Sequence, residues 1–145
     1  MLPQIVASKT DVQLQPAPIE ASWILEGRPS ADSAELCSSE DGRATTILWE
    51  CTSGRFNWAY DYDETAYIIA GSVIIEGETM KPTRFSQGDV VFFPRGARVT
   101  WHVEDHIRKL AFVRNPDDSF SSKVIRRIKR VIQAERTTGL TGRAT

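Results

Sequence analysis

Aromatic side chains and one carboxylate alternate along residues 58–64, and these residue types could build a small-molecule site. In an extended strand every second residue faces the same side. Trp58, Tyr60 and Tyr62 therefore share one face, with Glu64 at its end. Turned toward a barrel interior, this face would form an aromatic pocket in which one carboxylate orients an organic ligand. The alternative is a filled interior, because small barrels usually pack their centres with side chains.

Glu64 has two candidate roles. An apolar surrounding favours the protonated form of a carboxyl group, so Glu64 could act as a general acid or base. The alternative, which the sequence favours, is a structural carboxylate hydrogen-bonded to Tyr60, Trp101 or Lys109.

A second candidate cluster is His102-x-Glu104-x-His106. On a strand the three side chains would face one side, a geometry that could hold a metal ion. Trp101 and Val103 are the apolar partners in this alternation and should face inward, which leaves the histidines on the solvent side. The chain has only these two histidines. We therefore predict no metal site and no cofactor.

The elements that would position these residues are short strands. Runs of β-branched and aromatic residues, separated by Gly, Asp and Pro turn signals, predict an all-β sandwich or barrel. They occupy 44–51, 56–60, 66–70, 72–76, 90–93, 98–103 and 108–113.

The segments on either side of these runs differ in composition. Residues 1–43 have three prolines in the first 20 positions and many Ser, Asp and Glu after position 26. They predict an N-terminal arm with one edge strand, then a loop over 26–43 with a turn of helix at Ser33–Leu36. Residues 44–115 form the predicted core. Residues 116–145 predict an amphipathic helix at about 122–136 and a loose polar tail.

Composition limits the classes of function. The chain has 145 residues, 41% of them hydrophobic and 26% charged, and a net charge of −1. These values suit one soluble domain and indicate neither a nucleic-acid partner nor a membrane. The two cysteines, Cys37 and Cys51, could form one disulfide. The simpler interpretation is that they are bystander thiols in a reducing, cytoplasmic setting. The basic predicted helix is best explained as a solvated face packed on its own barrel or on another subunit.

Two segments, 54–73 and 88–103, resemble the paired motifs of the cupin superfamily. Gly88, Pro94 and Gly96 match the turn positions of the second motif, while Glu64 and Gly71 match the end of the first. The resemblance implies a jelly-roll barrel. Its metal-binding histidine positions are occupied here by three other residues, namely Trp58, Tyr60 and Val99. Aromatic and aliphatic side chains are poor ligands for transition metals.

The same substitutions resemble one branch of the superfamily, the cupin domain of (S)-ureidoglycine aminohydrolase. The branch pattern is matched by Trp58, Tyr60, Glu64, Tyr67, Gly88, Asp89, Phe93, Pro94, Gly96, Trp101, Val103 and Lys109. The resemblance implies that this chain is a single-domain member of the branch. It does not imply the aminohydrolase activity, because that enzyme binds manganese through ligands that this chain lacks.

We therefore predict a metal-free small-molecule-binding protein whose pocket is formed by Trp58, Tyr60, Glu64, Val99 and Trp101. The alternative is a small enzyme that uses Glu64 with Tyr60 or Lys109 for acid–base chemistry on a nitrogenous or carboxylate metabolite. A weaker alternative keeps a metal and an aminohydrolase-like activity. Because barrel edge strands need cover, we also expect a homodimer in which the N-terminal arm crosses to the partner.

Overall fold

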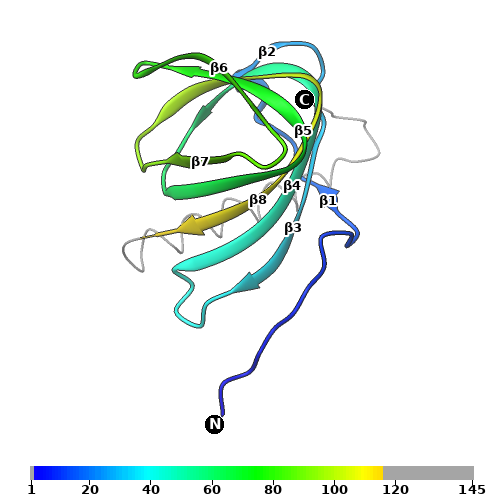
Figure 1. The fold of residues 1–145 in the computed structure, drawn as a ribbon, viewed down its shortest axis with the longest axis vertical. Coiled ribbons are helices and arrows are strands. Elements are labelled where there is room, and N and C mark those ends of the chain that lie inside the picture. Colours follow the sequence, from blue (N-terminus) through cyan, green and yellow to red (C-terminus); the bar gives the residue numbers. More distant parts are fainter. Residues whose placement is uncertain (1, 116–145) are drawn as a thin grey trace.

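The computed structural model describes residues 2–115, and β-strands make up nearly all of its regular structure (Figure 1). A single turn of 3-10 helix, η1 (Ala21–Trp23), precedes the second strand. The strands are β1 (Gln15–Pro16), β2 (Ile24–Glu26), β3 (Ala31–Ser38), β4 (Ala44–Ala59), β5 (Asp63–Gly77), β6 (Met80–Ser86), β7 (Val90–Phe93) and β8 (Arg98–Arg114). The all-β prediction is confirmed.

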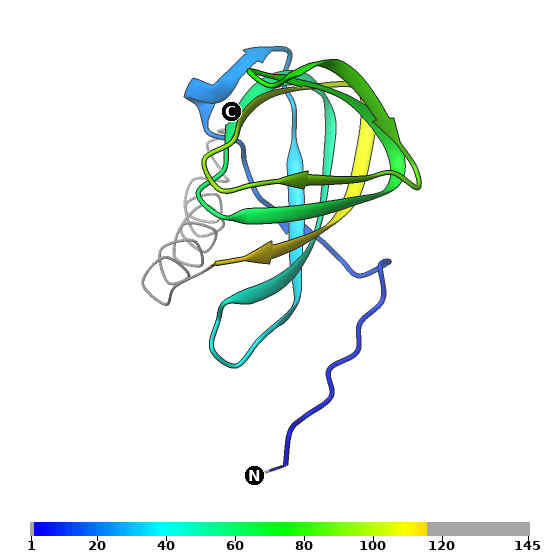
Figure 2. The ribbon, with the colours of Figure 1, turned by 60° about the vertical axis from the view of Figure 1, so that its left-hand side comes forward.

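The strands form one antiparallel sheet that curls into a barrel (Figures 1 and 2). Its strand order is β1-β3-β4-β8-β5-β6, with β2 paired to β4 and β7 paired to β5. The central strand β8 pairs with β4 on one side and β5 on the other along most of its length. This arrangement is the jelly-roll barrel that the motifs predicted.

The three long strands bend where the sequence predicted breaks. The β4–β8 register shifts between Thr52 and Gly54, opposite Glu104 and Asp105, which are both exposed. The β5–β8 register shifts at the same level of β8. Extra residues of this kind form bulges that bend a strand without ending it. The separate runs predicted on each side of these positions are therefore halves of single strands.

The prediction of a loop with a helical turn over residues 26–43 is wrong, because β3 occupies Ala31–Ser38. β3 pairs with β4 over Ala31↔Cys51 to Ser38↔Thr45. Ala31 and Ser33 are buried, and Asp32 between them is more exposed. The polar composition concealed this alternation, since small Ala and Ser side chains fill the inward positions instead of large apolar ones.

Four smaller features of the sequence have different outcomes. The edge strand expected within residues 1–20 is present as β1. β6, which contains Pro82, was not predicted as a strand, because proline and charged residues lower strand propensity; as an edge strand it tolerates them. The turns at Gly88 and Gly96 have the positive φ that the sequence indicated, 96° and 95°. The predicted helix at 122–136 lies outside the described residues.

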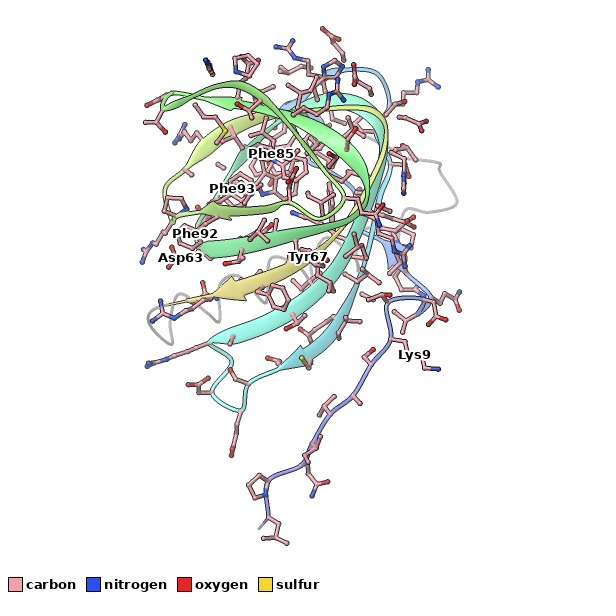
Figure 3. All side chains as sticks on the ribbon, viewed as in Figure 1. Lys9, Asp63, Tyr67, Phe85, Phe92 and Phe93 are labelled. Atoms are coloured by element: carbon pink, nitrogen blue, oxygen red, sulfur yellow. The ribbon has the colours of Figure 1, made fainter. Side chains whose placement is uncertain are left out.

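The two faces of the barrel wall differ in composition. The inner side holds the core, in which Phe56, Tyr60, Phe93 and Trp101 are almost fully buried. Neighbouring residues on β7 illustrate the alternation, because Phe93 is 3% exposed and Phe92 is 58% exposed (Figure 3). Residues 2–9 extend away from the barrel (Figures 1 and 2). The Thr10 carbonyl accepts a hydrogen bond from Arg108 on β8, and Ile19 returns the chain to the core. Within residues 2–115 no helix is long and apolar enough to cross a membrane.

Candidate ligand-binding cavity

A buried ion pair lies on the inner face of the barrel. Lys109 Nζ on β8 donates a hydrogen bond to Glu64 Oε2 on β5 at 2.6 Å. The Lys109 side chain is 7% exposed and that of Glu64 is 4% exposed. Removing two charges from water is costly, and the cost is offset only where they pair closely. Of the three partners predicted for a structural Glu64, the structure thus contains the hydrogen bond to Lys109.

Strand register and small side chains make room for this pair. In the β5–β8 ladder Glu64 is opposite Val113, and Lys109 is opposite Ile68. Ala66 and Ala111 form the inward pair between these two positions, and both are buried. Because neither alanine extends beyond Cβ, the long Lys109 side chain passes over them to reach the carboxylate.

Aromatic rings surround the ammonium group. Lys109 Nζ lies 4.7 Å from the ring centroid of Trp49 and 4.7 Å from that of Trp101. Positive charge over an indole face is attracted by the ring quadrupole, more strongly when water is excluded. The ammonium is therefore held by one carboxylate and two tryptophans.

A cavity of about 110 Å³ opens beside the pair. Its floor includes Glu64 and Lys109, and its walls include four aromatic rings. The other walls come from the N-terminal segment and from β3, β4 and β8. The lining residues are Ala17, Pro18, Ile19, Glu20, Trp23, Ser33, Ile47, Trp49, Trp58, Ala59, Tyr62, Glu64, Lys109, Ala111 and Val113. The interior is thus not completely filled at this end.

The predicted pocket residues are divided between the cavity and the core beneath it. Trp58 and Glu64 line the cavity. Tyr60 and Trp101 are buried next to it, where Tyr60 stacks on Phe93 with ring centroids 4.5 Å apart. Val99 lines a second cleft that shares Trp58 with the first.

Sequence reasoning missed Trp23, Trp49 and Glu20 as lining residues. Trp49 carried a usable signal, since it lies in a predicted strand and alternates with Ile47, which also lines the cavity. Trp23 carried none, because its position depends on η1 folding back against β4. Its ring meets that of Trp58 edge-on, with centroids 5.1 Å apart.

The Tyr60 hydroxyl and the Trp101 indole N–H are buried polar groups that find no well-formed hydrogen bond among the described residues. Burial raises the pKa of Tyr60 well above its usual value, and the nearby Glu64 carboxylate and Tyr62 add to this effect. The Trp101 indole has a smaller effect, which lowers the pKa of Tyr60. The phenol therefore stays protonated over the physiological pH range and can donate a hydrogen bond.

The His102–Glu104–His106 cluster lies on the outer side of β8, as predicted, because Trp101 and Val103 are buried. Glu104 forms an ion pair with Arg84 at 2.6 Å, and this hydrogen bond lowers the pKa of the carboxyl group. Both cysteines are free thiols, Cys37 exposed and Cys51 buried on the inner face of β4.

The donor set around Glu64 does not fit the metal that cupin motifs imply. The motif positions hold Trp58, Tyr60 and Val99, and the Glu64 carboxylate is already engaged by the Lys109 ammonium. Among residues 2–115, no three His, Cys, Asp or Glu side chains converge closely enough to hold a metal ion. A cation is nevertheless present beside the motif carboxylate, since Lys109 supplies one from the chain itself.

Comparison with known proteins identifies the family. The EutQ-like cupin domain matches residues 38–111, and the chain belongs to this family. The chain is also 32% identical over 119 residues to a protein of Clostridioides difficile (strain 630) named "Acetate kinase EutQ". The match covers 78% of this chain and 73% of that protein.

Solved structures share the fold. The Clostridium difficile EutQ protein matches with a TM-score of 0.54 at 24% identity, over 61% of this chain and 65% of that one. A protein of the DUF861 family from Pseudomonas syringae pv. tomato matches with a TM-score of 0.66 at 22% identity, over 72% of this chain and 46% of that one. This chain thus spans less than two thirds of either structure, and the likeness shows the fold alone.

Proposed function

We propose that this cupin binds a small organic molecule in the cavity beside Glu64, without a metal. The observation that carries the proposal is a cavity of about 110 Å³ with aromatic walls and a charged floor formed by Glu64 and Lys109. Ligand sites typically combine an apolar surface with a few placed polar groups. The names of the relatives describe those proteins and do not identify the ligand of this chain.

The residues that replace the metal ligands support this proposal. The Trp58-x-Tyr60 pattern with Glu64, Trp101 and Lys109 is the pattern by which the chain resembles the ureidoglycine aminohydrolase branch. We propose membership of that branch without its metal-dependent activity. An aminohydrolase-like activity with a metal is the weaker alternative, and a stoichiometric metal in the purified protein would support it instead.

Thermal-shift screening of small amines, alcohols, amides and carboxylic acids tests the binding proposal. Hits should raise the unfolding temperature of the unmodified protein and lose this effect in Ala111→Leu, which fills the cavity. Phe112→Leu, a change on the outer side of the same strand, is the matched control. Hits that survive Ala111→Leu would place binding elsewhere and contradict the proposal.

A second candidate function is acid–base catalysis by Glu64 with Tyr60 or Lys109. The observation that favours it is the closeness of the three groups: Lys109 contacts Glu64, and the Glu64 charge acts on the Tyr60 phenol. Incubation of each screening hit followed by mass spectrometry distinguishes the two functions. A binding protein returns the compound unchanged, whereas an enzyme converts it and loses this turnover in Glu64→Gln.

We also propose a homodimer that buries two exposed apolar surfaces. Leu2, Ile5 and Val6 on the arm are 81%, 98% and 65% exposed. On the outer sheet face Tyr67 and Phe92 are also exposed (Figure 3). An arm that lies on the partner's outer face would cover both surfaces. Light scattering that gives a monomer mass at all usable concentrations would contradict this arrangement.

The location that we propose is the cytoplasm. Both thiols are free in the structure, which agrees with a reducing compartment.

A further inference from the structure

The buried pair of Lys109 and Glu64 places a primary amine beside the cavity. Both side chains line the cavity, and they are only 7% and 4% exposed. A buried ion pair is often no more stabilising than apolar residues of the same volume. Charged groups that are buried in a cleft, each beside a specific partner, are therefore candidates for chemistry rather than for stability alone.

The contacts of Lys109 suit a nucleophilic amine. An amine attacks a carbonyl carbon only through the lone pair of its neutral form, and buried lysines are the ones that proteins use for Schiff bases. Lys109 Nζ donates its hydrogen bond to Glu64 Oε2 at 2.6 Å, so a proton acceptor is already in contact with the nitrogen. Where water is excluded, the neutral amine–acid pair lies closer in free energy to the ion pair than it does in water. Proton transfer to Glu64 would thus expose the lone pair.

The cavity has the size and polarity for a short neutral carbonyl compound. Its volume of about 110 Å³ has room for about three or four carbon atoms, given that a water molecule takes about 30 Å³ of the liquid. Ile47, Trp58 and Val113 provide apolar lining for an alkyl chain. Because Glu64 already matches the charge of Lys109, a neutral ligand leaves the charge balance of the pair unchanged.

We propose that Lys109 binds a short aliphatic aldehyde as a reversible Schiff base, a proposal that rests on the proposed ligand-binding function. Lys109 gives one proton to Glu64, and its lone pair forms the C–N bond while the carbonyl oxygen takes that proton. Glu64 then accepts a second proton from the nitrogen and passes it to the new hydroxyl group. This group leaves as water as the C=N bond forms. The product is a protonated imine beside the Glu64 carboxylate, and hydrolysis returns the aldehyde unchanged.

Reductive trapping tests the proposal with an internal control. The unmodified protein is incubated with propanal and sodium cyanoborohydride, which reduces an imine to a stable propyl-lysine, and peptide mass spectrometry follows each lysine over time. Lys9 and Lys81 are exposed and report ordinary solution reactivity. Lys109 should be labelled at least about tenfold faster than either. A buried amine without this chemistry would react only from opened states and would be labelled more slowly than both.

A variant and a second aldehyde show whether the reaction takes place in the cavity. Ala111→Leu fills the cavity and should abolish the rapid labelling of Lys109, while Lys9 and Lys81 react as before. Phe112→Leu, on the outer side of the same strand, is the matched control and should leave every rate unchanged. Pyrenecarboxaldehyde, which is too large for the cavity, gives the same test without a substitution and should label only the exposed lysines.

The outcomes separate this proposal from the ligand-binding function. Labelling of Lys109 no faster than that of the exposed lysines would overturn the Schiff base. Rapid labelling that persists in Ala111→Leu would also overturn it, because the aldehyde would then reach the amine without the cavity. If the broader compound screen still gives hits that Ala111→Leu abolishes, the binding function stands without the Schiff base; if it gives none, both proposals fail.

Discussion

Two of the ion pairs formed by strand β8 lie on opposite faces of the barrel wall. Lys109 on the inner face meets Glu64, and Glu104 on the outer face meets Arg84, both at 2.6 Å. The inner side chains are 7% and 4% exposed, whereas the outer ones are 51% and 48% exposed. The two pairs have equal distances but should differ in their effect on stability, because water screens the outer pair and is excluded from the inner one.

The two faces of the barrel wall also differ in the chemistry that their residues could perform. The outer cluster has two histidines and a carboxylate, residue types that suggest metal chemistry. It lies on the outer face of the barrel wall, however, and Glu104 is engaged by Arg84. The inner cluster has no histidine, but it lies beside a cavity and among aromatic rings. Enclosure, more than residue type, distinguishes the candidate site from the surface. The following predictions test this contrast, beginning with the largest expected effect.

Thiol labelling should show the largest difference between the inner face and the surface. Iodoacetamide should modify exposed Cys37 readily and Cys51 at least about a thousandfold more slowly, because Cys51 reacts only from opened states. Burial raises the pKa of Cys51 to about 12, so below that pH its thiol is mostly protonated and unreactive. In Cys37→Ser, mass spectrometry should find almost no label; rapid labelling of this variant would show that the interior is open near β4.

Breaking the inner ion pair should cost the most stability. Lys109→Met leaves the Glu64 carboxylate buried without its cation, and the free energy of unfolding should fall by about 3–5 kcal/mol in a urea titration. The double variant Glu64→Gln/Lys109→Met removes both charges and should recover most of that loss. A double variant as unstable as the single one would mean that packing of the lysine stem, rather than charge pairing, stabilises this region.

Removing the Tyr60 hydroxyl should have a smaller effect of opposite sign. Tyr60→Phe deletes a buried polar group that lacks a good hydrogen bond, and it should raise the free energy of unfolding by about 1 kcal/mol. A loss of stability by the same amount would instead indicate that the hydroxyl is hydrogen-bonded in solution.

Breaking the outer ion pair should have the smallest effect. Arg84→Ala removes the partner of an exposed carboxylate, so a urea titration should show no change beyond its error at any salt concentration. A salt-dependent loss comparable with that of Lys109→Met would eliminate the proposed contrast between the two faces.

Local sequence patterns were sufficient to predict much of the barrel. Alternation in 98–103 correctly placed Trp101 and Val103 inside and the histidines outside, and Gly88 and Gly96 correctly indicated turns. The same patterns failed for β3, whose inward residues are small, and for β6, whose composition is that of a loop. They also divided long strands at bends, because a turn signal and a bulge use the same residue types.

Glu64 and the aromatic residues of 58–62 could be selected as candidates from the chain alone, because alternation along a strand depends only on local geometry. The pairing of Glu64 with Lys109 could not be derived from alternation, since the two residues are 45 positions apart and meet through the β5–β8 register over Ala66 and Ala111. Whether the interior is open depends on how side chains from distant strands and from η1 sum to fill a volume. Local sequence thus selects the residues that face inward, and long-range packing sets the cavity among them.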